Sequence, residues 1–423
     1  MQMQLDILSI GDELIIGQVV NTNASFIAKE FDRIGIATRR IVTVGDQKAI
    51  IQAELKASLE QVDIAVLTGG LGPTHDDITK AALAELFGLE YEFNEEAYQN
   101  CLSLFQRRGL KMPDINRSQA EVLRGALVLQ NSCGTAPGMI LHHLPSYPER
   151  YVVVMPGVPI EMQEMMRRSV LPYFAPLSKT YIKHTHLMTS GIGESQISEL
   201  LGDEKAFLLP QTTLAYLPQT THVKLRITTR GTDREQVEQE NSAVVDFITR
   251  RLRKYLYATD DQPIEAVVGK LLQARRLTLA TAESCTGGLI AHRITNVPGS
   301  SSYFLQSFVT YNNAAKERSL GVRHETLAEF GAVSEEVARE MAIGCLAKSG
   351  ADIAIATTGI AGPSGGSDAK PVGMLCLGLA TNHKLGNQVK TKTLYFTKDR
   401  LQNKELFSQA ALDWLRLTLT ETD

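Results

Sequence analysis

The stretch LTLATAESCTGGLIAHRI, residues 277–294, joins the pattern of a buried strand to the start of a helix. Its apolar run over 277–282 predicts a strand, and the glycine turn that follows predicts a helix near 287–295. Side chains on such a turn lie beside the free N–H groups of the helix start. Because open α/β sheets bind ligands at the carboxyl ends of their strands, we expect a site on this turn.

Strands and helices continue to alternate around this stretch, from about residue 261 to the C-terminus. Pro263 suits the first position of a helix that is predicted to reach Ala274. The strand predicted at 352–358 is followed by a second glycine-rich loop, which suits the binding of ribose or phosphate by backbone amides. The remaining predictions are strands at 303–311, near 372–380 and near 391–396, and helices at 334–348 and up to Leu419.

The first 170 residues have the same α/β texture. They contain predicted strands and helices in alternation, namely strands at 5–10, 36–44, 64–68 and 151–155 and helices at 22–34 and 48–59. Residues 171–260 differ, because the stretch 222–231 alternates like an antiparallel strand and a polar helix follows at 235–255. The sequence therefore predicts two three-layer α/β/α domains, 1–170 and 261–423, joined by a small α+β module.

The composition favours a soluble enzyme that acts on a small molecule. A chain of 423 residues exceeds one hydrophobic core. With 43 basic against 47 acidic side chains, it lacks the electrostatic signature of nucleic-acid binding or of a membrane surface. Its five cysteines show no metal-binding spacing and predict reduced thiols. Since neither a signal peptide nor a transmembrane segment is evident, we expect a cytoplasmic protein.

The turn at 282–288 offers two nucleophiles, Ser284 and Cys285, and local pattern does not choose between them. His292 is poorly placed as a base because it lies well past the helix start. Lys316, in the segment FVTYNNAAKE, could act as a base if the fold buried it beside the serine, because burial lowers the pKa of a lysine. It could equally be an exposed helix lysine, and spacing alone does not decide.

A second group of polar residues and glycines lies in the first domain, after the strands at 5–10 and 64–68. Glycine-rich backbone next to acidic side chains suits a diphosphate bridged by a hard divalent metal ion. The alternative is a tight turn in which Asp76 and Asp77 cap a helix. His75 is treated as incidental. The candidate residues are Asp12, Glu13, Asn23, Gly69, Gly70, Gly72, Thr74, Asp76 and Asp77, of which Asp12, Asp76 and Asp77 are the candidate metal ligands.

Longer motifs in the last domain resemble the C-terminal domain of the competence/damage-inducible CinA family, across nearly all of residues 263–423. They are AESCTGG, FVTYNNAAK, GAVSEEVAREMA, TGIAGPSGGSDAKPVG and FTKDR. The resemblance implies a nicotinamide-mononucleotide deamidase that needs no metal or other cofactor, with Ser284 as nucleophile assisted by Tyr311 and Lys316. Substrate would be held by Cys285, Thr286, Gly287, Gly288, Thr358, Gly359, Ala361, Gly362 and Arg400, the last by pairing with phosphate.

The motifs GDELIIGQVVNTN, TGGLGPTHDD and PGVPIEM resemble the N-terminal domain of the same family. That domain is similar in fold to molybdopterin-binding proteins, and some members use it as a metal-dependent ADP-ribose pyrophosphatase. The resemblance implies an enzyme of pyridine-nucleotide salvage that acts on nicotinamide mononucleotide and ADP-ribose, and it suggests a homodimer. The alternatives are a non-catalytic regulatory protein linked to competence or DNA damage, and a molybdopterin-handling protein.

Overall fold

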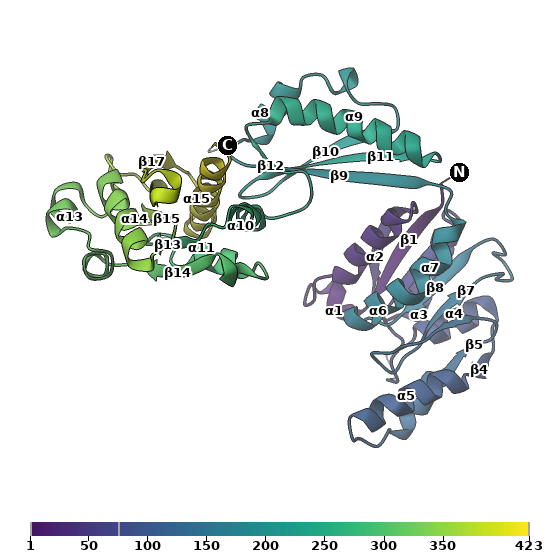
Figure 1. Ribbon diagram of the computed structural model, residues 1–423. Coiled ribbons are helices and arrows are strands. Elements are labelled where there is room, and N and C mark those ends of the chain that lie inside the picture. The colour runs from purple at the N-terminus through teal and green to yellow at the C-terminus, as the bar shows by residue number, and fades with distance from the viewer. Residues whose placement is uncertain (1, 75–76, 422–423) are drawn as a thin grey trace. The chain divides into compact units, whose positions relative to one another are not determined.

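The computed structural model describes residues 2–74 and 77–421 (Figure 1). The structure is mixed α/β with several sheets, as the sequence predicts. The chain divides into two compact units, Met1–Lys183 with Thr229–Gln239, and His184–Thr228 with Glu240–Asp423. In the part of the chain described, no helix is long and apolar enough to cross a membrane.

A six-stranded sheet, in the order β2-β1-β3-β8-β7-β6, forms the centre of the first domain. The four predicted strands are parallel neighbours: β1 (Gln4–Ile10), β2 (Ala37–Val44), β3 (Ile64–Thr68) and β8 (Tyr151–Met155). The sequence missed β7 (Gly138–Leu141) and β6 (Leu127–Leu129), which extend the sheet antiparallel at one edge. The domain is therefore not purely parallel.

Helices cover both faces of this sheet because successive strand residues point to opposite sides. Ile7 packs in a core with α2 (Thr22–Arg33), α6 (Pro159–Met165) and α7 (Leu171–Phe174). Leu8 packs in a second core with α3 (Lys48–Leu59) and α4 (Thr79–Phe87). The remaining elements are α1 (Asp12–Ile15), β4 (Tyr91–Phe93), α5 (Glu95–Arg107) and β5 (Glu121–Leu123).

The middle of the chain forms a four-stranded sheet in the order β10-β11-β9-β12. Its strands are β9 (Tyr181–Thr189), β10 (Thr212–Pro218), β11 (Val223–Gly231) and β12 (Leu256–Ala258). Two helices accompany the sheet, α8 (Glu194–Leu201) and α9 (Arg234–Leu252). Ile197 of α8 and Val244 of α9 are buried in one cluster with Leu225 of β11, so side chains of both helices and of the sheet form the core of this module.

The last domain is built on a five-stranded sheet in the order β14-β13-β15-β16-β17. The parallel strands are β14 (Phe304–Val309), β13 (Leu279–Glu283) and β15 (Ile353–Gly359). The strands β16 (Met374–Thr381) and β17 (Val389–Tyr395) continue the sheet antiparallel. Since β13 and β15 are parallel neighbours, the two glycine-rich loops that follow them meet at the same edge.

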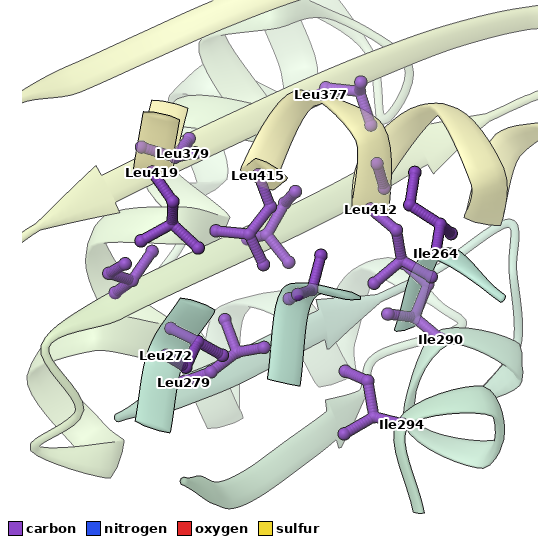
Figure 2. Packing of buried hydrophobic residues seen from close by; sticks show 14 of the residues in the cluster. Ile264, Leu272, Leu279, Ile290, Ile294, Leu377, Leu379, Leu412, Leu415 and Leu419 are labelled. Atoms are coloured by element: carbon purple, nitrogen blue, oxygen red, sulfur yellow. The ribbon is translucent and has the colours of Figure 1, made fainter. Parts of the chain in front are cut away.

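One face of this sheet packs against α10 (Ile264–Ala274), α11 (Leu289–Thr295) and α15 (Arg400–Glu421). Leu412, Leu415 and Leu419 of α15 are buried in one cluster with Leu272 and Leu279 (Figure 2). Each such side chain contributes about 1.5–3 kcal/mol by leaving water. The opposite face packs against α13 (His324–Phe330) and α14 (Glu335–Ser349).

Candidate active site

The nucleophile turn begins where β13 ends. Ser284 follows Glu283 directly, and its N–H donates to the carbonyl of Thr357 on β15, at 2.9 Å. Gly287 N–H donates back to the Ser284 carbonyl at 3.1 Å. Gly287 and Gly288 have φ angles of 61° and 92°, a left-handed conformation that glycine adopts without strain. The turn therefore holds Ser284 between a buried strand and the start of α11.

Glu283 is a structural residue of this turn that the sequence analysis did not single out. Its side chain is completely buried and accepts hydrogen bonds from Ile290 N at 3.0 Å and Ala291 N at 2.8 Å. Thr286 Oγ1 also donates to it, at 2.8 Å. A buried carboxylate at this place satisfies N–H groups at the start of α11. Thr286, predicted to bind substrate, is itself fully buried and supports the turn instead.

Lys316 reaches Ser284 from a different part of the sheet edge. It follows the short helix α12 (Asn313–Ala315) and begins a π-helical turn, Lys316–Leu320. Its Nζ lies 3.0 Å from Ser284 Oγ and donates to the carbonyl of Thr310 at 3.0 Å. Such single π-helical turns are frequent at functional sites. The alternative of an exposed helix lysine is wrong, since only 1% of Lys316 is accessible to solvent.

Burial lowers the pKa of Lys316 below its ordinary value of 10.5, because the ammonium form loses its hydration. Among the described residues, no carboxylate forms an ion pair with this amine to restore the charged form. A lysine with a lowered pKa, within proton-transfer distance of a hydroxyl, has the properties of a general base.

Cys285 has the opposite character. It is 6% exposed, and burial raises the pKa of its thiol to about 12, which leaves almost no thiolate at neutral pH. Ser284 is buried almost as deeply, at 8% exposed, so the two neighbours differ in the contact of Ser284 with Lys316 and in the raised pKa of the Cys285 thiol. Ser284 has a base beside it, whereas Cys285 lines the pocket as a small apolar side chain.

Tyr311, which the resemblance pairs with Lys316 in catalysis, lines the same pocket as the lysine but is hydrogen-bonded to Arg400. It is 62% exposed, and its hydroxyl accepts from Arg400 Nη2 at 2.8 Å. Within the described contacts it forms no hydrogen bond with Ser284 or Lys316. Arg400 Nη1 also donates to the carbonyl of Gly362 at 2.6 Å, so the guanidinium links the tyrosine to the second glycine-rich loop.

A pocket of about 250 Å³ brings these groups together. Its lining combines the nucleophile turn, the lysine segment, the turn before α14, the end of β15 with the loop after it, and the start of α15: Ser284, Cys285, Tyr311, Asn313, Lys316, Ala332, Val333, Thr358, Gly359, Ala361 and Arg400. Of the predicted substrate residues, Thr286, Gly287, Gly288 and Gly362 are not part of this lining, although they belong to the loops beside it. His292 is exposed and bonded to Asn296, as expected of a surface residue.

Two residues of α15 near the pocket were missed by the sequence analysis. Asn403 is fully buried, and its Nδ2 donates to the carbonyls of Ala361 and Lys398, which fixes the second glycine-rich loop. Lys404 extends its ammonium to the nucleophile turn, where a Cβ on Gly287 would lie 3.6 Å from Nζ. Lys404 lies one helical turn after Arg400, and residues so spaced share a helix face.

A second pocket, of about 480 Å³, lies in the first domain at the carboxyl ends of β1 and β3. Glu13, Gly69, Gly70, Gly72 and Asp77 of the predicted set line it. The sequence analysis missed Asp46, Gln119 and Glu161, which line the same space. Glu161 accepts from Asn131 Nδ2 at 2.7 Å, and burial raises the pKa of its carboxyl group.

The other predicted residues of this domain are held by local contacts. Asp77 accepts from Thr74 N at 2.9 Å and from Thr74 Oγ1 at 2.5 Å, within the loop. The residue that precedes α4 is Ile78, with no side-chain capping bond, so the alternative in which Asp77 caps this helix is wrong. Asp12 accepts from the backbone N–H of Asp46 at 3.3 Å. Asn23 donates to the Gly157 carbonyl at 2.7 Å and so fixes the PGVP turn. Asp76 and His75 lie outside the described residues.

The described carboxylates do not by themselves form a metal centre. Carboxylates line the pocket, and oxygen is the ligand that Mg²⁺ and Ca²⁺ prefer. However, no three His, Cys, Asp or Glu side chains in residues 2–74 and 77–421 form a group able to hold a metal. Asp76, the third predicted ligand beside Asp12 and Asp77, lies outside the described residues, so the predicted ligand set stays a prediction.

Three family descriptions match successive parts of the chain. Residues 6–176 match the family described as "Probable molybdopterin binding domain". Residues 184–258 match "Damage-inducible protein CinA KH domain", and residues 261–419 match "CinA C-terminal domain". A CinA-like protein of Chloroherpeton thalassium is 60% identical, covering 98% of this chain and 99% of the relative. One of Chlorobaculum tepidum is 46% identical over 100% of both chains.

Among solved structures, the competence/damage inducible protein CihA of Agrobacterium tumefaciens is 39% identical. The match covers 38% of this chain and 97% of the CihA chain, with a TM-score of 0.35. Since relatives of high identity span nearly the whole sequence, the chain belongs to the family of CinA-like proteins.

Proposed function

We propose that the last domain hydrolyses the carboxamide of nicotinamide mononucleotide, with Ser284 as nucleophile and Lys316 as general base. The observation that carries the proposal is the distance of 3.0 Å between Lys316 Nζ and Ser284 Oγ, in a place where burial lowers the pKa of the amine. Serine is a weak nucleophile unless a base removes its proton. This geometry supplies that base without a histidine.

The reaction follows from this pair. Lys316 takes the proton of Ser284 Oγ as the oxygen attacks the carboxamide carbon, and the resulting ammonium group passes a proton to the leaving nitrogen. Ammonia departs and an ester on Ser284 remains. Lys316 then takes a proton from water as the water oxygen attacks the ester. It passes that proton to Ser284 Oγ as the ester bond breaks and nicotinate mononucleotide is released.

The N–H groups that follow the nucleophile would stabilise the oxyanion. Those of Ser284 and Gly287 are already engaged with Thr357 and Ser284 carbonyls. We assign the role to the N–H groups of Cys285 and Thr286, which lie on the same turn at the start of α11. Preorganised donors of this kind act strongly because they need no rearrangement during the reaction.

The cations of α15 support a substrate that carries phosphate. Arg400 lines the pocket, and Lys404 extends to the nucleophile turn. Arginine binds phosphate through two parallel hydrogen bonds. We propose that Arg400 leaves Tyr311 to pair with the phosphate of the mononucleotide and that Lys404 adds a second positive charge.

Matched variants test the assignment of the nucleophile. Ser284→Ala should abolish ammonia release from nicotinamide mononucleotide, whereas Cys285→Ala should keep most of it, because the thiol is buried and protonated. Ammonia release is measured on the full-length protein without added metal. Loss of activity in Cys285→Ala with activity retained in Ser284→Ala would mean that Cys285, and not Ser284, is the nucleophile.

For the first domain we propose binding and cleavage of a diphosphate such as that of ADP-ribose. The supporting observation is that five glycines and four carboxylate residues line one pocket at the strand ends. We expect a divalent metal ion to be supplied together with the substrate, whose phosphate oxygens would complete its ligands. Chelation and Asp77→Asn should each abolish ADP-ribose hydrolysis and leave ammonia release unchanged. Hydrolysis that survives both would contradict the proposal.

A further inference from the structure

A third pocket, of about 570 Å³, lies away from both sites already described. All of its lining residues belong to the unit His184–Thr228 with Glu240–Asp423. One side is formed by the loops 190–194 and 218–223, and the other by β17 and by α15 from Leu406 to Leu417. Binding sites for small molecules usually occupy about 300–1,000 Å³. We call this space the Trp414 pocket.

The walls of the Trp414 pocket are held together by buried contacts. Met188 and Tyr257 of the middle module are buried in the same apolar cluster as Ile264 and Leu415 of the last domain. Lys224 and Asp261 form an ion pair beside this cluster. The pocket is therefore bounded on both sides by packed structure.

Gln409 is a buried polar side chain in this wall with an unmet hydrogen bond. It is 4% exposed, and its Oε1 accepts from Arg293 Nη2 at 2.8 Å. Because a guanidinium only donates, the amide oxygen must face Arg293 and the amide nitrogen must face away. Nε2 has no partner among the described residues. Nε2 itself has almost no accessible surface, so a ligand in the pocket can reach it only if the Gln409 amide turns toward the pocket. A buried donor without an acceptor costs free energy, and an acceptor on a ligand would remove that cost and so favour the turn.

Aromatic and polar groups divide the remaining lining. Tyr395, Phe396 and Trp414 offer ring surfaces, and Tyr395 is 62% exposed although its neighbours are packed. Aromatic faces stack well with planar heterocycles. Ser190, Gln219, Thr220 and Thr221 supply hydroxyl and amide groups at the other wall, suited to a ligand that carries hydroxyls.

The charges at the pocket balance. Glu194 and Lys392 are of opposite sign, and Asp413 accepts from Arg416 Nε at 2.8 Å. Burial lowers the pKa of His222, which is therefore uncharged near neutral pH. Such a lining offers no excess positive charge for a phosphate, so it favours a ligand without net charge.

We propose that the Trp414 pocket binds an uncharged nucleoside, whose base packs on the aromatic wall and accepts a hydrogen bond from Gln409 Nε2 after the amide of Gln409 turns toward it. This site is separate from the proposed amidase and does not depend on it. Binding of a nucleoside here would make the protein responsive to the nucleoside pool.

The chain contains a single tryptophan, so its fluorescence reports on this pocket alone. Adenosine added to the full-length protein should change Trp414 emission saturably, and equilibrium dialysis should give the same dissociation constant. Gln409→Glu keeps an acceptor for Arg293 but replaces the donor by an oxygen, and should weaken binding at least about tenfold. Gln273→Glu, the same change at an exposed glutamine of α10, should leave binding unchanged.

Tyr395→Ala, at the exposed part of the wall, is a second variant that should also weaken adenosine binding. Ser284→Ala should bind adenosine as the unmodified protein does, although it lacks ammonia release. Absence of binding in the dialysis experiment, or equal affinity in Gln409→Glu and Gln273→Glu, would overturn the proposal. So would loss of binding in Ser284→Ala, because the nucleoside would then occupy the amidase pocket.

Discussion

Burial decides the chemistry of individual residues in the proposed active site. The sequence identifies the turn with Ser284 and Cys285 and the segment with Lys316, because residue types and glycine spacing are local properties. It cannot show that residues 32 positions apart meet at 3.0 Å, since this depends on the pairing of β13 with β14. It also cannot rank the two nucleophiles, because the thiol pKa follows from burial.

Lys316→Met should separate catalysis from stability. Methionine fills similar space without an amine, so ammonia release should fall by about 10²–10⁴-fold as the base is lost. The free energy of unfolding should change by less than about 1 kcal/mol, because the lost bond to Thr310 is offset by relief of the buried amine's desolvation. Urea unfolding and a kcat measurement check both. A large loss of stability would mean that the lysine is mainly structural.

The pH dependence gives a second prediction for the same residue. Since the base must be neutral, kcat/KM should rise with pH and reach its half-maximum below the ordinary lysine pKa of 10.5. Between the lowered folded pKa and the unfolded pKa, the unfolded chain binds the proton and the folded chain does not. Stability from this group therefore increases with pH. The Lys316→Met variant should lack that increase in stability. The same dependence of stability on pH in both proteins would refute the lowered pKa of Lys316.

At the scale of elements, the sequence predicts long periodic segments well and short edge strands poorly. The helix Lys48–Leu59 and the strand Ile64–Thr68 lie where the pattern places them. The strands Leu127–Leu129 and Gly138–Leu141 are too short for a clear alternation and exist because they pair with the sheet edge. The sequence did not predict that Glu283 accepts hydrogen bonds from the start of α11, because its neighbours in sequence mark it only as the end of a strand.

Glu283→Gln should disturb the junction of β13 and α11. The amide offers a single oxygen where the carboxylate accepts from Ile290, Ala291 and Thr286, and its NH₂ group faces donors. We expect unfolding to become easier by about 2–4 kcal/mol and kcat to fall as Ser284 shifts. Glu325→Gln, at an exposed position of α13, should change stability by less than about 0.5 kcal/mol. Equal stability of the two variants, from urea midpoints, would contradict the capping role.

For the whole molecule, the alternation of patterns predicts two α/β domains with a different module between them, and the described structure is mixed α/β in this way. Sheet order could not be read from the sequence, because strand neighbours such as β3 and β8 are about 80 residues apart and meet only through tertiary packing. The Trp414 pocket escaped prediction for the same reason. Its walls come from four separate segments of chain.

The fragment 261–423 should release ammonia with the kcat of the full-length protein. Every lining residue of the amidase pocket lies within it, and both cores of its sheet are formed almost entirely by its own side chains. Loss of Met188 and Tyr257 from the shared core should lower its melting temperature. A folded fragment without activity, judged by circular dichroism and ammonia release, would show that other domains complete the site.

The most direct test of the Ser284–Lys316 mechanism is to trap the covalent intermediate. Nicotinamide mononucleotide is mixed with the full-length protein, quenched in acid within milliseconds, and the digest is analysed by mass spectrometry. We predict an acyl group from the substrate on the Ser284 side chain, and none in Lys316→Met. An acyl group on Cys285, or ammonia release with no acylated serine at any time, would contradict the account.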